Sequence, residues 1–223
     1  MAHDEAYRKV EQKIKAAIQQ TETQWLNLSN FKLTEIPELL NHHKQMMGLD
    51  ISSNYLKALP ESFGPFRLLR ELRISNNQLE LLPESLGNNF RLDILDVSNN
   101  YLTALPVSIG KLKQLRFLDV SKNKITSLQN IENEFYTLIL YLSGNYLTEL
   151  PDALQNLTQI RELHLDNSLL KRLPYWVGGF TQLQDLDVSN NQLTDLPSSL
   201  AFLTNLKRIK LDGNPLNLEL SKA

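Results

Sequence analysis

The sequence of 223 residues contains no cysteine. That absence excludes disulfides, thiolate-bound zinc, iron–sulfur clusters and cysteine nucleophiles. It also favours a reducing compartment, because structural disulfides belong mainly to secreted proteins. Apolar runs of about 18 residues or more, long enough to span a membrane, are missing too, and the first residues include no apolar stretch of signal length. We therefore expect a soluble cytoplasmic protein.

A surplus of one charge and the common catalytic motifs are also missing. The formal net charge is -2, whereas nucleic-acid-binding domains usually carry a basic surplus. The sequence has no glycine-rich phosphate loop, no G-x-S-x-G and no H-E-x-x-H. His42 and His43 are adjacent, but the pattern brings no carboxylate or third histidine near them. We expect no enzymatic activity, no metal or cofactor site and no nucleic-acid partner.

The sequence is rich in internal repetition. A unit L-x-x-L-x-L-x-x-N-x-L recurs in nine copies from Thr23 to the C-terminus. Successive copies are 23 residues apart, except for one step of 22 residues between Asn123 and Asn145. The ninth position of the unit is occupied in turn by Phe31, Asn54, Asn77, Asn100, Asn123, Asn145, Ser168, Asn191 and Asn214.

Each unit alternates apolar and polar residues with the period of a β-strand. In the third copy, Leu72 and Ile74 are expected to point inward, while Glu71, Arg73 and Ser75 point outward. The asparagine at position nine can both donate and accept hydrogen bonds where the strand ends. Because one unit cannot bury its apolar side alone, the copies are expected to stack around one continuous core.

The unit, followed by x-x-L-P-x-x-L-x-x-L, resembles the 23-residue cytosolic type of leucine-rich repeat. The leucine–proline pair stands at 59–60, 82–83, 105–106, 150–151, 173–174 and 196–197, with Ile36-Pro37 in the first copy. The pattern is similar to Ras suppressor protein, the Shoc-type Ras-binding scaffolds and the repeat domains of Roco-type proteins. The resemblance covers residues 23–223 and implies an α/β fold, a curved solenoid of nine repeats with a parallel concave sheet.

Residues 1–22 do not repeat and are predicted to form an N-terminal capping helix. Apolar residues recur there at helical spacing, and Asp4 is placed to cap the helix N-terminus. Solenoids need such a cap over the open core edge of the first repeat. A partner-binding or membrane-surface helix is the alternative, but the mixed charges disfavour a membrane role. The apolar positions of this helix are Ala6, Tyr7, Val10, Ile14, Ala17 and Ile18.

Two other segments depart from the pattern. The fifth copy, over residues 127–135, has no proline and is one residue short, so a local change such as a short helix is expected on its convex side. At the C-terminus no dedicated cap is visible. Either Leu218 and Leu220 fold back as a minimal cap, or the chain continues in a longer protein, and an uncovered core edge leaves end-to-end dimers open as an alternative to a monomer.

The outward positions predict a protein-binding surface. Position three places Ile94, Phe117 and Ile139 on consecutive strands, roughly 4.8 Å apart, and position five places Asp96 and Asp119 beside them. An apolar cluster with a charged border is typical of protein interfaces, and two tyrosines of position ten would line the rim. The predicted contacts are Arg73, Ile94, Asp96, Tyr101, Phe117, Asp119, Ile139, Tyr141, Tyr146 and His164.

The outward positions of neighbouring strands also permit two catalytic interpretations. Asp96 and Asp119 could form a carboxylate pair for acid–base chemistry, and Tyr141, His164 and Asp187 could form a relay. Both interpretations are disfavoured, because an open concave face does not exclude water and no nucleophile with an adjacent base is apparent.

The first hypothesis for function is a non-enzymatic scaffold that binds a protein or peptide on its concave face. The family resemblance implies a small GTPase or another signalling complex as the partner. The alternative is the targeting domain of a larger catalytic protein, of the Roco GTPase or ubiquitin ligase type. A purely structural consensus array is disfavoured, because positions three and five differ between copies.

Overall fold

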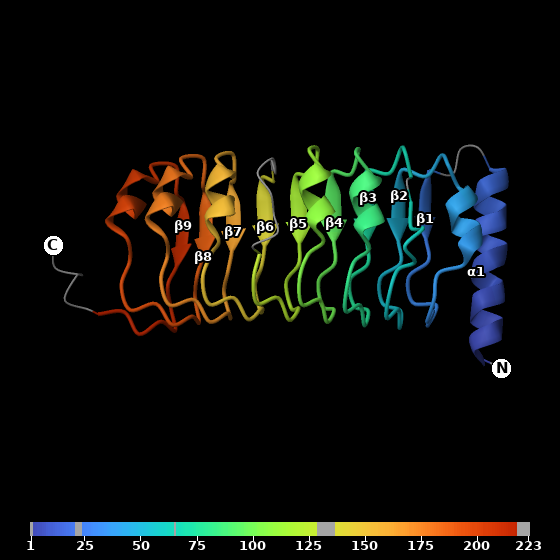
Figure 1. Ribbon diagram of the computed structural model, residues 1–223, viewed down its shortest axis with the longest axis horizontal. Helices are drawn as coiled ribbons and strands as arrows, with labels where there is room; N and C mark the ends of the chain where they lie inside the picture. The colour runs from blue at the N-terminus through green and yellow to red at the C-terminus, as the bar shows by residue number, and fades with distance from the viewer. Residues whose placement is uncertain (1, 21–23, 65, 129–136, 218–223) are drawn as a thin grey trace.

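The computed structural model describes residues 2–20, 24–64, 66–128 and 137–217. These residues form one open, curved, parallel sheet in which the strands follow sequence order, with helix α1 (Ala2–Gln19) at its N-terminal end (Figure 1). The predicted solenoid is therefore confirmed. Its strands are β1 (Trp25–Asn27), β2 (Gly48–Asp50), β3 (Glu71–Arg73), β4 (Ile94–Asp96), β5 (Phe117–Asp119), β6 (Ile139–Tyr141), β7 (Glu162–His164), β8 (Asp185–Asp187) and β9 (Arg208–Lys210).

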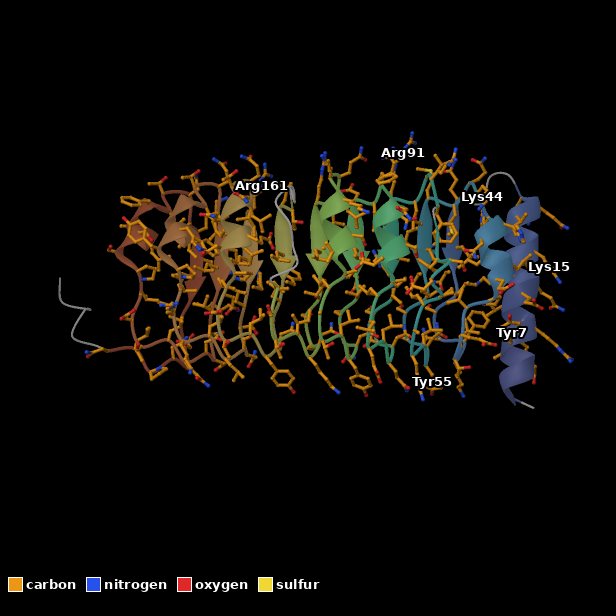
Figure 2. The ribbon with its side chains drawn as sticks, viewed as in Figure 1. Tyr7, Lys15, Lys44, Tyr55, Arg91 and Arg161 are labelled. Atoms are coloured by element: carbon orange, nitrogen blue, oxygen red, sulfur yellow. The ribbon has the colours of Figure 1, made fainter. Side chains whose placement is uncertain are left out.

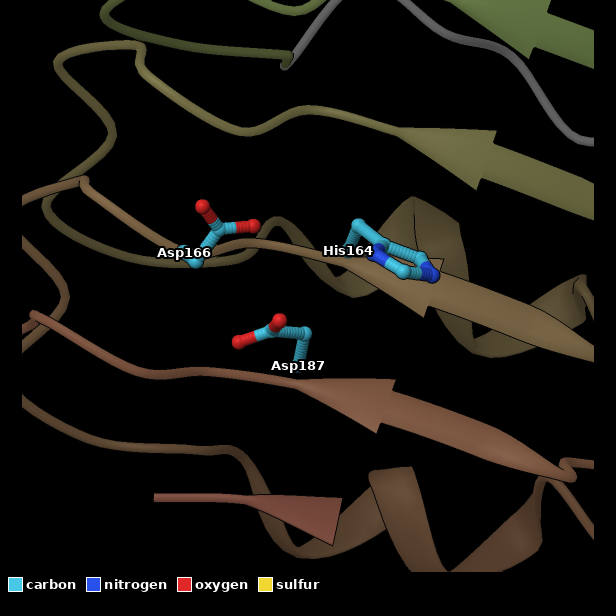
Figure 3. Close-up of side chains that lie close together, drawn as sticks. All are labelled: His164, Asp166 and Asp187. Carbon is cyan, nitrogen blue, oxygen red and sulfur yellow. The ribbon is translucent and has the colours of Figure 1, made fainter. Parts of the chain in front are cut away.

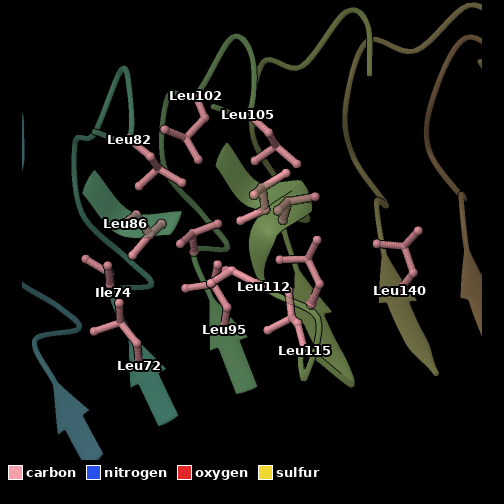
Figure 4. Packing of buried hydrophobic residues seen from close by; sticks show 14 of the residues in the cluster. Leu72, Ile74, Leu82, Leu86, Leu95, Leu102, Leu105, Leu112, Leu115 and Leu140 are labelled. Atoms are coloured by element: carbon pink, nitrogen blue, oxygen red, sulfur yellow. The ribbon is translucent and has the colours of Figure 1, made fainter. Parts of the chain in front are cut away.

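Every strand occupies positions three to five of its repeat, and equivalent positions pair across the sheet. In β3, Leu72 is fully buried, whereas Arg73 is exposed. Ser75 was expected to point outward but is buried, because the strand ends at Arg73 and the alternation does not extend to Ser75. Side chains of positions four and six from neighbouring repeats stack behind the sheet in one continuous core (Figure 4).

The convex side is built from short 3-10 helices that begin directly after the repeat proline. Proline fixes φ near -65° and lacks an N–H, so it suits the residue before the first helical turn. Pro83 and Pro106, for example, have φ of -70° and -66°. In the described residues these helices are η1 (Glu38–His42), η2 (Glu84–Asn88), η3 (Val107–Lys111), η4 (Asp152–Asn156), η5 (Tyr175–Gly179) and η6 (Ser198–Phe202). The change predicted over residues 127–135 falls largely outside the described residues.

The asparagine of position nine joins neighbouring repeats. Asn100 Oδ1 accepts a hydrogen bond of 3.0 Å from the Leu79 amide, and its Nδ2 donates to the carbonyls of Ile74 and Val97. Equivalent bonds recur at most copies, so a buried amide satisfies backbone groups of two repeats at once. Ser168 interrupts this ladder, because its buried Oγ has no hydrogen-bond partner.

Helix α1 packs against the first repeat and buries Val10, Ile14 and Ala17. Phe31 replaces the first ladder asparagine and is packed against the same core, with Lys13 Nζ 5.3 Å from its ring centroid. The helix begins at Ala2, so Asp4 lies inside its first turn, and the predicted N-cap at Asp4 is wrong. None of the described helices combines the length and apolarity needed to cross a bilayer.

Candidate protein-binding face

The sheet register brings the predicted apolar residues together. Ile94 pairs with Phe117 and Phe117 with Ile139, so the three side chains lie side by side on the concave face. All three are half-buried rather than protruding. With Leu138 they form the floor of a hollow of about 440 Å³, whose walls include Arg73, Asp93, Asp96 and Arg116. We call Ile94, Phe117, Leu138 and Ile139 the apolar floor.

Aromatic rings continue this surface towards β7. The Phe117 and Tyr141 ring centroids are 5.5 Å apart and those of Tyr141 and His164 are 4.5 Å apart, both edge-to-face. The Tyr141 hydroxyl donates a hydrogen bond of 3.1 Å to Glu162. Burial, followed by this bond to Glu162, raises the pKa of Tyr141 to about 12. Tyr141 is therefore a neutral hydrogen-bond donor at physiological pH, and its partner Glu162 is not a member of the relay that the sequence analysis disfavoured.

The two acids beside the floor are anchored by serines two residues further along. Asp96 accepts hydrogen bonds from the Ser98 amide at 3.0 Å and hydroxyl at 2.7 Å, and Asp119 accepts one from the Ser121 amide. Desolvation by burial nevertheless raises the pKa of Asp119, and the neighbouring charge of Asp96 adds to the increase. The pair forms a negative border, and the described residues that line the hollow offer no nucleophile beside it.

His164, Asp166 and Asp187 form a cluster that the sequence analysis did not single out (Figure 3). One ligand atom from each lies within 4.8 Å of the others, a spacing compatible with a metal ion. Lys210 Nζ, however, is 2.7 Å from Asp187 Oδ2 and supplies the positive charge. The signal in the sequence was Asp166, which stands where most other repeats have serine.

The oxygens of both acids in this cluster already accept hydrogen bonds. Ser189 donates to Asp187 Oδ1, and Asp166 accepts bonds from Ser143 and Asn167. Burial alone would raise the pKa of Asp187, but the hydrogen bonds from Lys210 and Ser189 outweigh it and lower the pKa. The cluster is therefore a lysine-paired polar network, and Asp187 pairs with Lys210 rather than forming the disfavoured relay with His164.

The remaining predicted contacts lie away from the floor or at its margin. Tyr101 and Tyr146 are about half exposed on the strand-exit edge, where Lys124 Nζ lies 4.5 Å from the Tyr101 ring centroid. Figure 2 labels Tyr55, the equivalent residue of an earlier repeat, on that edge. Arg73 lies at the wall of the hollow and pairs with Glu71 on its own strand. The structure thus groups the predicted residues into a floor with its walls and a separate tyrosine rim.

A second hollow was missed by the sequence analysis, which considered positions three, five and ten only. It lies at the strand-entry edge, has a volume of about 470 Å³ and includes Asp93 in its lining. Four exposed cations line it, and we call them the basic rim: Arg70, Arg91, Lys113 and Arg116. The sequence feature that could have indicated this hollow is arginine at position two of alternate repeats, as at Arg70 and Arg116.

Comparison with known proteins identifies the repeat. Leucine-rich repeat family models match residues 68–89, 91–133, 136–157 and 161–216. The chain is a leucine-rich repeat protein. Such domains generally mediate protein–protein interaction and are typically non-enzymatic. A comparison with curated protein sequences finds no match. The finer resemblance to Ras suppressor, Shoc-type and Roco-type proteins stays a prediction.

Solved structures share the fold of this leucine-rich repeat protein. A leucine-rich repeat protein of Leptospira interrogans is 32% identical with a TM-score of 0.80, and the match covers 86% of this chain and 49% of that one. The leucine-rich effector YopM of Yersinia pestis is 27% identical with a TM-score of 0.73, covering 94% and 60%. The plant peptide hormone receptor RGFR1, solved with RGF2, is 23% identical with a TM-score of 0.74, covering 88% and 33%. The chain thus spans about half to three fifths of the first two proteins.

Proposed function

We propose that this leucine-rich repeat protein is a non-catalytic recognition module that binds a protein segment across its concave face. The observation that carries the proposal is the apolar floor, which lies beside charged residues in one open hollow. Half-buried apolar side chains in a concave site give an incoming side chain a desolvated contact, which is where interface energy concentrates. The acids Asp96 and Asp119 add a negative border that suits a basic group of the partner.

Phe117 lies at the centre of the floor and pairs with Ile94 on one side and Ile139 on the other. Phe117→Asp places a charge where the partner's apolar side chain would be buried. We expect peptides selected from a random phage library on the wild-type protein to bind this variant on the order of 30-fold more weakly, because a central anchor is worth about 2 kcal/mol or more. Fluorescence polarisation with the synthesised peptides measures the change.

The matched control is Val107→Asp on the convex helix η3, where Val107 is exposed. Circular dichroism must show that both variants are folded. Equal affinity of Phe117→Asp and wild type for every selected peptide would contradict the proposal, as would a selection that yields no peptide above background.

The partner class follows from the family resemblance, which points to a small GTPase or another signalling complex in the cytoplasm. The absence of cysteine supports a reducing compartment. In the alternative function, this chain is the targeting domain of a larger catalytic protein, and the same face directs that protein to its target. GTP hydrolysis or ubiquitin transfer by the purified chain would contradict both versions, since each assigns recognition alone to these residues.

A further inference from the structure

The basic rim concentrates positive charge in a protein whose net charge is -2. Its four cations face one hollow, and Asp93 is the single carboxylate in the lining; the other lining residues are Gln114, Leu138 and Gln159. Long cationic side chains around a concavity raise the local positive potential more than the same charges spread over a surface. The hollow is therefore a site of concentrated positive charge on a molecule whose net charge is slightly negative.

The carboxylate offsets only part of the charge of the rim, because one aspartate faces four cations. Arg116 Nε forms an ion pair with Asp93 Oδ1 at 3.9 Å, too long for a hydrogen bond, and the Arg116 side chain is largely exposed. The main chain at this edge is already used by the sheet, since the Asp93 amide donates to Arg70 and the Arg116 amide donates to Asp93. The side chains of the rim, rather than its backbone, are thus the groups that would bind a ligand here.

The rim and the apolar floor share lining residues. Asp93, Arg116 and Leu138 border both hollows, so the two are continuous. A segment that crosses the sheet along the strand direction meets the basic rim, then the apolar floor and then Asp96 and Asp119. The groove therefore has a positive end, an apolar middle and a negative end, and its ligand must carry the complementary order.

We infer that the ligand is a peptide segment with a phosphorylated side chain beside apolar side chains, the phosphate bound by the basic rim and the apolar groups by the floor. This inference rests on the proposed function. A phosphomonoester carries a charge of about -1.5 to -2 and three acceptor oxygens, and arginine forks bind such oxygens in pairs. One carboxylate, with a single charge and two oxygens, would match fewer of the N–H donors that Arg70 and Arg116 present.

A polyanion is the competing occupant, because other cations follow the same edge. Figure 2 shows Lys44, Arg91 and Arg161 along it. The peptide is favoured because the rim opens into the apolar floor, which a sugar–phosphate backbone would not fill, and because a flat bilayer does not enter a concave hollow. The test must separate these ligands.

The probes are two immobilised degenerate peptide libraries that are identical except for phosphoserine or serine at the central position. The labelled protein is expected to bind the phosphoserine library at least tenfold more strongly and to select apolar residues next to the phosphate. R70Q/R116Q should reduce this preference to less than twofold. The matched control K171Q/R172Q removes two exposed cations from another repeat and should keep it.

The outcomes distinguish the inference from the proposed function. Equal binding of both libraries, with the binding abolished in Phe117→Asp, would overturn the phosphate site and leave the concave recognition function standing. A phosphate preference that survives R70Q/R116Q, or that K171Q/R172Q also removes, would overturn the assignment to the rim. Tighter binding of an RNA oligonucleotide or of phosphatidylserine vesicles than of the selected phosphopeptides would replace the peptide with a polyanion.

Discussion

Two aspartates at position five, in the same register of the sheet, have pKa values shifted in opposite directions. Asp119 and Asp187 each end a strand and each accept hydrogen bonds from the serine two residues later. Asp187 also receives the ammonium group of Lys210, and its pKa is lowered. Asp119 has Asp96 as its neighbour, and its pKa is raised by burial and then by that negative charge. The adjacent repeat therefore decides whether the carboxylate stabilises the fold.

The raised pKa of Asp119 makes a prediction about pH. Folding favours its protonated form, so its ionisation weakens the fold as pH rises from the ordinary value of 3.8 through the raised value. Asp119→Asn, which keeps an acceptor for the Ser121 amide, should unfold at a higher temperature than wild type at pH 7. The difference should shrink towards pH 3, and thermal melts across this range measure it.

Asp187→Asn is the matched variant. Its carboxylate has a lowered pKa and contributes stability above the ordinary value, which is lost as pH falls through the lowered one. This variant should therefore be less stable than wild type at pH 7. Destabilisation of both variants by the same amount would mean that position-five acids act only through their serine hydrogen bonds.

At the scale of the element, the asparagines of position nine form a ladder of hydrogen bonds. This asparagine ladder stabilises the contact between each repeat and the next. Each ladder asparagine accepts from one backbone amide and donates to carbonyls of its own and the preceding repeat, as Asn191 does with Leu170, Leu165 and Val188. Ser168 is too short to reproduce these bonds, and its Oγ is buried without a partner. The contact between the repeats of β6 and β7 is thus the weak point of the ladder.

Ser168→Asn should repair this point. By the spacing of the other copies, the new amide would accept from Leu147 and donate to the carbonyls of Leu142 and Leu165. We expect a gain of about 1–2 kcal/mol in the free energy of unfolding, the usual value for one or two buried hydrogen bonds. Urea denaturation measures it. The reverse change, Asn191→Ser, should lose a comparable amount, and a Ser168→Asn protein less stable than wild type would contradict the ladder account.

The sequence predicted the strands of the sheet and their register well. It predicted the convex turns and the side-chain contacts less well. The 23-residue spacing fixed which residues pair, so Ile94, Phe117 and Ile139 were placed side by side correctly. The same spacing places Lys210 beside Asp187, but it could not show that the two side chains form an ion pair. It also gave no helical signal after the prolines, because a five-residue 3-10 turn is too short to show a period. The basic rim was missed because its cations come from three different positions of the repeat.

At the scale of the whole molecule, each repeat contacts mainly its neighbours, so the two ends of the solenoid determine how it begins to unfold. Helix α1 covers one end and buries Ile14 fully. At the other end, all three residues of β9 are exposed, whereas the central residue of β1 is buried. In the described part of the chain, protection is therefore unequal between the two ends.

Ile14→Ala should weaken the covered end. Removing a buried isoleucine side chain costs about 2–5 kcal/mol, and the loss should be felt first by β1 and β2. Hydrogen exchange followed by mass spectrometry should show faster exchange in these strands, with β7 unchanged. Lys15→Ala, on the exposed side of the same helix, is the control (Figure 2). Uniform acceleration across all repeats would mean that the solenoid unfolds as a single unit.

The register of the sheet separates the residues that build the molecule from those that would recognise a partner. Trp25, Gly48, Glu71 and Ile94 occupy the same position of consecutive strands, yet the strands pair identically. The frame therefore accepts very different side chains there when their neighbours are complementary, as where Gly48 leaves room for the Trp25 ring. After gene duplication, a few substitutions on the concave face could change the ligand without a compensating change in the core. Similarity at the leucine and asparagine positions then indicates common ancestry, whereas differences at the concave positions indicate a change of ligand.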